Sequence, residues 1–507
     1  MTNKKPTIRT RFAPSPTGFV HIGSLHTALF AFLFARHNNG VNVLRIEDTD
    51  QNRLVEGSLE NMLSVFKKMG ITFDEGPYVD NGIIKQKGEY GPYIQSERKA
   101  KGIYQKFAEQ LVEEKKAYHC FCSEERLEEM RKEQVALKKP PMYDRRCRNL
   151  SADEVQKQLV KFKAAGKNPV IRFAIPLEGH TVIHDLIYGD ITYENKILDD
   201  QIILKADGFP TYHLAVVVDD HFMEITHVIR GEEWIPSTPK HLLIYEALGW
   251  QPTQFAHLPL IVNTDKTKLA KRQGDVAVED FLKAGYAPEV LINFIALLGW
   301  NPKTEQEIFS LDQLIEQFDL AKVNNSNAVF DRIKLDWISG HYIRTKSEKE
   351  LAESLKPFWQ EAGVDITKYN DEYLRAIAGL EKERLKKLSE IGERTKYFFE
   401  APEYIADLLI WKKADKEKTK QALSDLLELF NATDKTKFSK EDIETSIKKM
   451  IADKGYDNGS VLWPLRVALT GLDKSPGPFE VCATLALGLG KEEIVKRLNT
   501  ALAKLGR

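Results

Sequence analysis

Residues 8–46 read IRTRFAPSPTGFVHIGSLHTALFAFLFARHNNGVNVLRI, and this stretch decides the fold. Residues 8–12 predict a short strand that ends at the proline- and glycine-rich turn 14–18. Apolar residues at spacings of three and four predict a helix over 22–36, and a second strand follows over 41–46. Strand, helix and strand make a βαβ unit, which predicts a parallel sheet with a crevice at the carboxyl ends of its strands.

Outward from this unit, the pattern changes along the chain. A cysteine cluster, a charged helix over 124–139 and a strand at 170–173 indicate an insertion that begins at about residue 118. Strands at 202–204 and 214–218 predict the second half of the sheet, and nearly every pattern after residue 280 is helical. We therefore predict an α/β fold: a Rossmann-like parallel sheet, interrupted by an α+β insertion and followed by an all-α region. The predicted parts are 1–117, 118–200, 201–260, 261–340 and 341–507.

Composition is typical of a soluble globular protein of about three domains, with 507 residues, 42% hydrophobic and 29% charged. The first residues lack the apolar core of a secretory signal, and no stretch reaches the ~18 apolar residues of a membrane-spanning helix. We therefore expect a cytoplasmic protein that does not enter a membrane. The net charge of −1 excludes a uniformly basic surface for nucleic acid, but not a local basic face.

The first motif that carries chemistry is R-F-A-P-S-P-T-G at residues 11–18, followed by His21-Ile22-Gly23-Ser24 at a helix start. The first turn of a helix presents unpaired N–H groups and a positive dipole end, which suit a phosphate. Gly23 allows close approach to the backbone, and His21 can donate to a phosphate oxygen. Taken alone, the segment is better explained by an ordinary loop with Ser24 as a helix cap.

The second motif, T-K-L-A-K-R-Q-G at residues 267–274, lies far downstream. Its three cations, closed by a glycine, suit a loop that stabilises charge developing on a leaving pyrophosphate. Taken alone, it is also what a solvated basic loop looks like.

In this order, the two motifs resemble the HIGH and KMSKS signatures of the class I aminoacyl-tRNA synthetases. Further segments are similar to those of bacterial-type glutamyl-tRNA synthetases: R-I-E-D-T-D (45–50), P-T-Y-H-L-A (210–215), V-V-D-D-H (217–221) and V-I-R-G-E-E (228–233). The resemblance covers about residues 7–340. It implies an enzyme that activates L-glutamate with ATP and Mg²⁺ and transfers it to the 3′ end of tRNA-Glu.

The resemblance also implies roles for individual residues. The implied catalytic residues are His21, Lys268 and Lys271; the implied ATP-binding residues are Pro14, Thr17, Gly18, His21, Gly23, Ser24 and Lys271; the implied glutamate-binding residues are Arg11, Ala13, Ser15, Glu47, Tyr212 and Arg230. The residue types agree with a substrate that has two carboxylates and one ammonium group. Two positions depart from the signatures, because Ser24 replaces a histidine and Ala270 replaces a serine.

Three alternatives accompany these roles. Arg45 and Glu47 can form a structural ion pair, and Arg230 can be a surface arginine paired with Glu232 or Glu233. The carboxylates of V-V-D-D-H are interpreted as structural or tRNA-contacting rather than catalytic.

A cysteine cluster resembles the zinc element that some relatives carry in an insertion that binds the tRNA acceptor arm. The implied ligands are Cys120, Cys122, Tyr143 and Cys147, since Asn149 stands where some relatives have a histidine. Zinc favours four ligands, and the three thiols leave one position for Tyr143 or water. The alternative is three reduced cysteines that support a small fold.

The resemblance assigns the helical region 341–507 to anticodon binding and residues 261–340 to the KMSKS-type loop and stem contacts. Taken alone, the basic and aromatic residues there indicate a charged helix face with a few buried aromatics: Arg384, Lys386, Lys387, Arg394, Lys396, Tyr397 and Phe398. Exposed aromatics near arginines would suit stacking and edge recognition of single-stranded bases.

The predicted function is glutamylation of tRNA-Glu by a monomer, and four other functions are possible alternatives. A glutaminyl-tRNA synthetase has a β-barrel anticodon region, and the short paralogue that glutamylates a modified tRNA base lacks a C-terminal region. An enzyme that also charges tRNA-Gln stays open as an alternative. A non-catalytic tRNA-binding protein is disfavoured by the presence of His21, Lys271 and Arg230.

Overall fold

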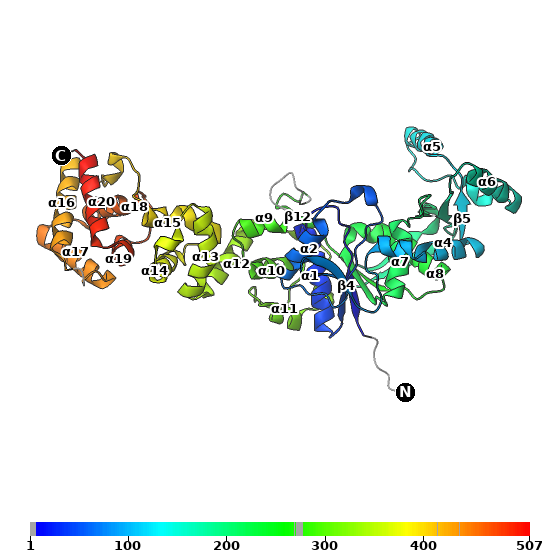
Figure 1. Cartoon of the computed structure of the whole chain (residues 1–507), viewed down its shortest axis with the longest axis horizontal. Helices are drawn as coiled ribbons and strands as arrows, with labels where there is room; N and C mark the ends of the chain where they lie inside the picture. Colours follow the sequence, from blue (N-terminus) through cyan, green and yellow to red (C-terminus); the bar gives the residue numbers. More distant parts are fainter. Residues whose placement is uncertain (1–6, 268, 270–276, 413, 435–436, 507) are drawn as a thin grey trace, which may run out of the picture. The chain divides into compact units, whose positions relative to one another are not determined.

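The computed structural model describes residues 7–267, 269, 277–412, 414–434 and 437–506 (Figure 1). The chain forms two compact units. The first consists of Met1–Phe281 and Leu291–Asp331, and the second of Leu282–Val290 and Arg332–Arg507.

A six-stranded sheet lies at the centre of the first unit, in the order β2-β1-β10-β11-β7-β8. Its neighbouring strands are parallel, except for the hairpin of β7 and β8. Strand β1 has β2 on one side and β10 on the other, and such a change in the direction of strand order leaves a crevice at the carboxyl ends. The strands are β1 (Arg9–Phe12), β2 (Val41–Leu44), β7 (His180–Asp185), β8 (Gly189–Glu194), β10 (His227–Gly231) and β11 (Gln254–Leu258). The predicted Rossmann-like parallel sheet is confirmed.

Helix α1 (Ile22–His37) connects β1 to β2 and is largely buried. It contacts β1, β2 and β10, and also α11 (Leu311–Gln317). An apolar pattern around the whole helix is what such coverage requires. Other helices whose residues lie in this unit are α2 (Ser58–Lys68), α3 (Gln95–Ala100), α4 (Ile103–Glu113), α5 (Glu124–Ala136), α6 (Ala152–Ala164), α7 (Tyr212–Phe222) and α8 (Thr238–Ala247), while α9 (Val278–Lys283) and α10 (Pro288–Ala296) carry residues of both units.

The segment 214–218, predicted as a strand, lies in helix α7, so this prediction is wrong. A short apolar run fits a buried strand and a buried helix equally well. All five of these residues are buried, because α7 contacts α4, α8 and β9 (Ile202–Leu204). A helix that is covered in this way needs no polar face that would reveal its period.

The predicted α+β insertion is confirmed by a three-stranded antiparallel sheet in the order β5-β6-β9, accompanied by α5 and α6. The segment 202–204 was predicted as a strand of the main sheet, but it forms β9 and pairs with β6, so that prediction is wrong. Strands β7 and β8 fall within the predicted range 118–200, yet they belong to the main sheet, since Asp185 pairs with Phe255 of β11. The exact boundaries of the five predicted parts stay predictions. The smaller strands are β3 (Gly76–Asp80), β4 (Ile83–Lys87), β5 (Ala117–Cys120), β6 (Val170–Phe173), β9 (Ile202–Leu204), β12 (Ile261–Val262) and β13 (Ala328–Val329).

The second unit is helical, as predicted, and Figure 1 shows it in yellow to red. One apolar core, which includes Trp359 and Tyr373, joins its helices. Within the described residues, no helix combines the length and the apolar character needed to cross a membrane. The helices are α12 (Arg332–Thr345), α13 (Glu348–Glu361), α14 (Asp371–Glu381), α15 (Ile391–Phe399), α16 (Lys416–Ala432), α17 (Lys440–Lys454), α18 (Asn458–Thr470), α19 (Pro478–Leu489) and α20 (Lys491–Lys504).

Candidate active site

A cavity of about 1120 Å³ opens at the carboxyl ends of the central strands of the first unit. Most of the predicted site residues meet there: Arg11, Ala13, Pro14, Ser15, Thr17, His21, Gly23, Ser24, Glu47, Tyr212 and Arg230 all line it. Gly18 is not among the lining residues. Lys268 and Lys271 lie outside the described residues, although Leu269 between them lines the cavity. Segments that are more than 200 residues apart in sequence therefore share one concave site.

His21 is the residue that caps α1, so the alternative of a Ser24 cap is wrong. Its Nδ1 accepts the Ser24 N–H at 3.1 Å, which leaves the Nε2 proton for Ser24 Oγ at 3.0 Å. A Cβ on Gly23 would lie 3.2 Å from the imidazole, so glycine is what lets the ring stand over the helix end. The first turn of α1 has no acidic residue, and its positive end remains available to an anion beside the cavity.

A buried ionic network forms one wall of the cavity. Asp220 accepts from Arg45 Nη1 at 2.6 Å and from Arg11 Nε at 3.3 Å. Arg45 Nη2 also donates to Glu47 at 2.9 Å, so the predicted ion pair of Arg45 and Glu47 exists, while Glu47 lines the cavity as well. Burial raises the pKa of Glu47 against the lowering effect of both arginines. Burial would also raise the pKa of Asp220, but Arg11 and Arg45 outweigh it and lower that pKa.

Arg230 is only 5% exposed, and neutral groups hold it. Its Nε donates to His257 Nε2 at 3.1 Å, Nη1 to the Tyr212 hydroxyl at 2.9 Å and Nη2 to Thr238 Oγ1 at 2.7 Å. It forms no ion pair with any described residue, so the alternative of a surface arginine paired with Glu232 or Glu233 is wrong. Burial lowers the pKa of Arg230, and the nearby Arg11 cation lowers it further.

Sequence reasoning found Tyr212 but missed two other residues that hold Arg230, His257 and Thr238. His257 lies on β11, and its bond to Asp185 spans 72 positions of the chain, so no local pattern connects them. Lys205 and Asp207 at the cavity were missed for the same reason. The structural interpretation of Asp219 and Asp220 is supported, because both are buried. In the sequence, the pattern that indicated this was the apolar run 214–218, which is followed directly by the two acidic residues.

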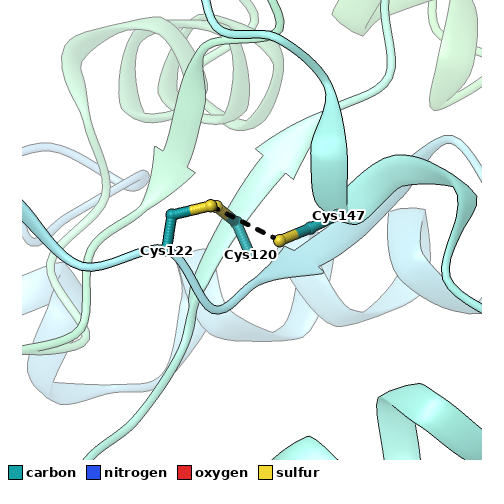
Figure 2. Close-up of side chains that lie close together, drawn as sticks. All are labelled: Cys120, Cys122 and Cys147. Carbon is teal, nitrogen blue, oxygen red and sulfur yellow. Dashed lines mark hydrogen bonds between the residues drawn. The ribbon is translucent and has the colours of Figure 1, made fainter. Parts of the chain in front are cut away.

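The three clustered cysteines of the insertion converge, and Figure 2 shows their side chains close together. All three sulfurs lie within 4.8 Å of one another, with Cys122 and Cys147 at 3.6 Å. The Tyr143 hydroxyl lies 3.4 Å from the sulfurs of both Cys120 and Cys122. Arg126 Nη1 donates to Cys122 Sγ at 3.4 Å. The four predicted ligands therefore meet at one place.

In the second unit, Tyr397 and Phe398 are buried, at 4% and 0% exposure, as the interpretation of a charged helix face with buried aromatics predicts. They form part of the core, and stacking on a nucleotide from there is excluded in this conformation. Arg384 and Arg394 lie on the surface side of the buried Glu381, at 3.0 and 3.8 Å from its carboxylate.

Comparison with known proteins agrees with both units. The family model for the catalytic domain of class I tRNA synthetases (E and Q) matches residues 7–337, and that for an anticodon binding domain matches residues 350–502. A glutamate–tRNA ligase of Alkaliphilus metalliredigens is 45% identical, with 97% of this chain and 98% of that protein covered. The corresponding enzyme of Dehalococcoides mccartyi is 44% identical over 100% and 99% of the two chains.

A solved structure is similar over the same length. The crystal structure of a glutamate–tRNA ligase from Elizabethkingia meningosepticum, in complex with its amino acid, superimposes with a TM-score of 0.87 at 37% identity. The match covers 98% of this chain and 100% of that one. With its parallel-sheet catalytic unit, its helical second unit and these full-length relatives, the chain belongs to the class I aminoacyl-tRNA synthetases, in the glutamate–tRNA ligase family.

Proposed function

We propose that the chain joins L-glutamate to the 3′ end of tRNA-Glu in two steps, with ATP as the source of energy. Arg230 is the observation that carries this proposal: a buried guanidinium beside an open cavity, without an ion pair among the described residues. A buried charge without a partner of opposite sign costs several kcal/mol. A cavity that keeps such a group is suited to an anionic substrate.

Arg11 and Arg230 recognise the side-chain carboxylate of glutamate in this proposal. Within the described residues Asp220 takes only the Nε–H of Arg11, so its two Nη groups remain for a ligand. Glu47 supplies the acidic group that the substrate ammonium requires, and Tyr212, Ala13 and Ser15 complete the pocket lining. Planar guanidinium groups favour a carboxylate, which accepts two parallel hydrogen bonds.

ATP binds at the amino end of α1 in this proposal, with its phosphates near His21, Gly23 and Ser24. Pro14, Thr17 and Gly18 belong to the loop before this helix end. Lys268 and Lys271 approach the leaving pyrophosphate, and Mg²⁺ supplies further neutralisation of phosphate charge when it is bound.

The reaction needs no nucleophile from the protein. An oxygen of the glutamate α-carboxylate attacks the α-phosphorus of ATP, the bond to pyrophosphate breaks, and glutamyl-adenylate forms. The terminal ribose hydroxyl of tRNA then attacks the acyl carbon, and AMP leaves. The side chains contribute by positioning the substrates and by stabilising the charge that develops.

A charging assay with purified tRNA-Glu and tRNA-Gln, side by side, tests the proposal. We expect glutamate to be attached to tRNA-Glu, and attachment to both tRNAs would identify the non-discriminating alternative. Pyrophosphate exchange with and without tRNA separates the remaining possibilities, because a non-catalytic tRNA-binding protein gives no exchange in either case. The monomeric state and the cytoplasmic location stay predictions.

Zinc in the cysteine cluster is the second part of the proposal, with Cys120, Cys122, Cys147 and Tyr143 as ligands. Sulfur ligands at a Zn–S distance of ~2.3 Å in a tetrahedral site lie roughly 3.8 Å apart. The 3.6 Å between Cys122 and Cys147 is close to that separation. The residues present therefore fit a structural zinc ion, which would tie β5 (Ala117–Cys120) to the turn at Cys147.

A further inference from the structure

Three neighbouring strands carry a continuous chain of hydrogen bonds behind the cavity. Arg230 on β10 and His257 on β11 are direct partners in the register of the sheet. Asp185 stands at the end of β7, the strand that follows β11 in the sheet. Asp185 Oδ2 lies 2.6 Å from His257 Nδ1, and His257 Nε2 lies 3.1 Å from Arg230 Nε. Asp185 and His257 are fully buried or nearly so.

The chain of bonds has a fixed direction. Arg230 has only donors, so His257 Nε2 must be an acceptor, and the ring proton is then on Nδ1, where the Asp185 carboxylate accepts it. Burial lowers the pKa of His257 and Arg230 lowers it further, against the raising effect of Asp185, so the ring is neutral at neutral pH. Asp185 thereby selects the form of the imidazole that can accept a hydrogen bond from Arg230.

Neutral acceptors fix the guanidinium without cancelling its charge. A carboxylate in direct contact with Arg230 would compete with a substrate carboxylate, whereas His257, Tyr212 and Thr238 do not. Thr238 Oγ1 itself donates to the Trp234 carbonyl at 3.2 Å, which leaves its lone pairs for Arg230. The imidazole ring of His257 lies between the Asp185 carboxylate and Arg230, so the negative charge does not contact the guanidinium.

We propose that His257 and Asp185 are positioning residues that hold the Arg230 guanidinium in place for the side-chain carboxylate of glutamate. This inference rests on the proposed glutamate pocket and adds two residues that set its affinity and specificity without touching the substrate. Without the His257 acceptor, the guanidinium of Arg230 is no longer held in one orientation. The affinity of the pocket for glutamate then falls, whereas the positions of the reacting α-carboxylate and ATP do not change.

Asp185 is a poor site for a test, because its Oδ1 accepts the Ile187 and Tyr188 amides at 2.9 Å each. Its other oxygen accepts the His257 amide at 3.1 Å, so an asparagine would turn an amide donor against a backbone N–H in either orientation. A change at Asp185 would therefore disturb the turn as well as the chain of bonds.

Two amide substitutions at His257 distinguish the contributions of the two ring nitrogens, Nδ1 and Nε2. By the number of bonds from Cα, an asparagine reaches as far as Nδ1 and still bonds Asp185, but it does not reach Arg230. A glutamine reaches as far as Nε2 and presents its oxygen to Arg230. We expect His257→Asn to raise the Michaelis constant for glutamate about ten- to hundredfold, the effect of losing a hydrogen bond to a charged group. We expect His257→Gln to stay within about threefold of wild type, since the acceptor is retained.

The measurement is steady-state charging of tRNA-Glu at saturating ATP, with kcat and the Michaelis constants for ATP, glutamate and glutamine determined separately. For both variants, kcat and the Michaelis constant for ATP should change by less than about twofold, because the lost interaction acts on glutamate binding alone. The preference for glutamate over glutamine should fall with His257→Asn. His227→Asn, which changes another buried histidine on the neighbouring strand β10, is the matched control and should leave every constant unchanged.

The inference is overturned if His257→Asn and His257→Gln give the same Michaelis constant for glutamate, whether raised or unchanged. A merely structural role for His257 would instead lower the amount of folded enzyme, and hence the apparent kcat, equally for both variants. Arg230→Gln in the same assay keeps the two proposals apart. If that variant leaves glutamate use intact, the pocket itself is wrongly assigned; if it abolishes glutamate use while both His257 variants behave as wild type, only the positioning role fails.

Discussion

At the scale of single residues, Arg230 combines burial, hydrogen bonds to four neutral side chains and a place in the cavity wall. The same guanidinium on the surface would be hydrated and would exchange partners freely. Inside the sheet it is fixed and poorly solvated, so its interaction with a bound anion is strengthened by the low local dielectric.

Arg230→Gln should raise the Michaelis constant for glutamate by a factor of about 100 or more, because a buried charge-assisted pair is lost. ATP binding should change by less than about twofold, and the preference for glutamate over glutamine should narrow, since a neutral amide no longer faces a cation. Arg36→Gln, which removes a half-buried arginine paired with Asp74, is the control. The test is steady-state kinetics with glutamate and with glutamine. An unchanged preference for glutamate over glutamine would refute the assignment of Arg230 to the glutamate pocket.

Gly23→Ala should impair ATP use through its effect on His21, since the new Cβ would lie 3.2 Å from the imidazole. We expect kcat/KM for ATP to fall about fivefold, the factor that corresponds to about 1 kcal/mol for a lost helix cap. His21→Asn keeps a capping side chain but removes the ring. If the effect runs through the ring, the double variant should be no worse than His21→Asn alone, whereas additive losses would show that Gly23 acts independently.

At the scale of elements, the βαβ unit was predictable from sequence because each of its elements has a distinct local period. Helix α7 was not, because Leu214–Val218 is covered from several sides and therefore shows no alternation between apolar and polar residues. The cysteine cluster was predictable because its members are near one another along the chain, from Cys120 to Cys147.

The residues proposed to bind glutamate were easier to predict from sequence than the residues that hold them in place. Arg11, Glu47 and Arg230 stand in segments with recognisable patterns, and all three line the cavity. Their partners lie far along the chain, since Asp220 meets Arg45 across 175 positions and Arg11 across 209. Such pairs are created by the order of the strands, and no single segment of sequence contains the information.

The cysteine element gives a prediction that activity measurements alone would not test. If zinc is bound, the purified protein should carry about one equivalent of zinc, and Cys122→Ser should remove it. Cys482→Ser, which changes the buried cysteine of the second unit, is the matched control and should leave the metal content unchanged. Elemental analysis reports both, and a metal-free wild-type protein with full charging activity would favour a purely structural role for the three thiols.

At the scale of the whole molecule, the two compact units have separate apolar cores. All residues that line the cavity belong to the first unit, so a ligand bound there would stabilise that unit directly. A ligand at a concentration of about 100 times its dissociation constant adds about 2.7 kcal/mol to the free energy of unfolding.

Differential scanning calorimetry should therefore show two transitions, of which glutamate with a non-hydrolysable ATP analogue raises only one by several degrees. The unaffected transition should belong to the helical unit, and a shortened tRNA stem that carries the anticodon loop should raise that transition instead. A single transition that moves as a whole with either ligand would show that the two cores unfold together.

The strand order also determines how long the amino-terminal part of the sheet stays incomplete during synthesis of the protein. Arg9 on β1 bonds Thr226 just before β10, 217 positions later, so one edge of β1 has no partner until β10 has left the ribosome. At about 5–20 residues per second, roughly 200 residues take about 10–40 s. For that time the nascent chain exposes an open strand edge and the apolar surface of α1, both of which favour aggregation. Slower translation lengthens this interval, so we expect the yield of folded enzyme to rise when chaperones cover the amino-terminal half until residue 231 has been synthesised.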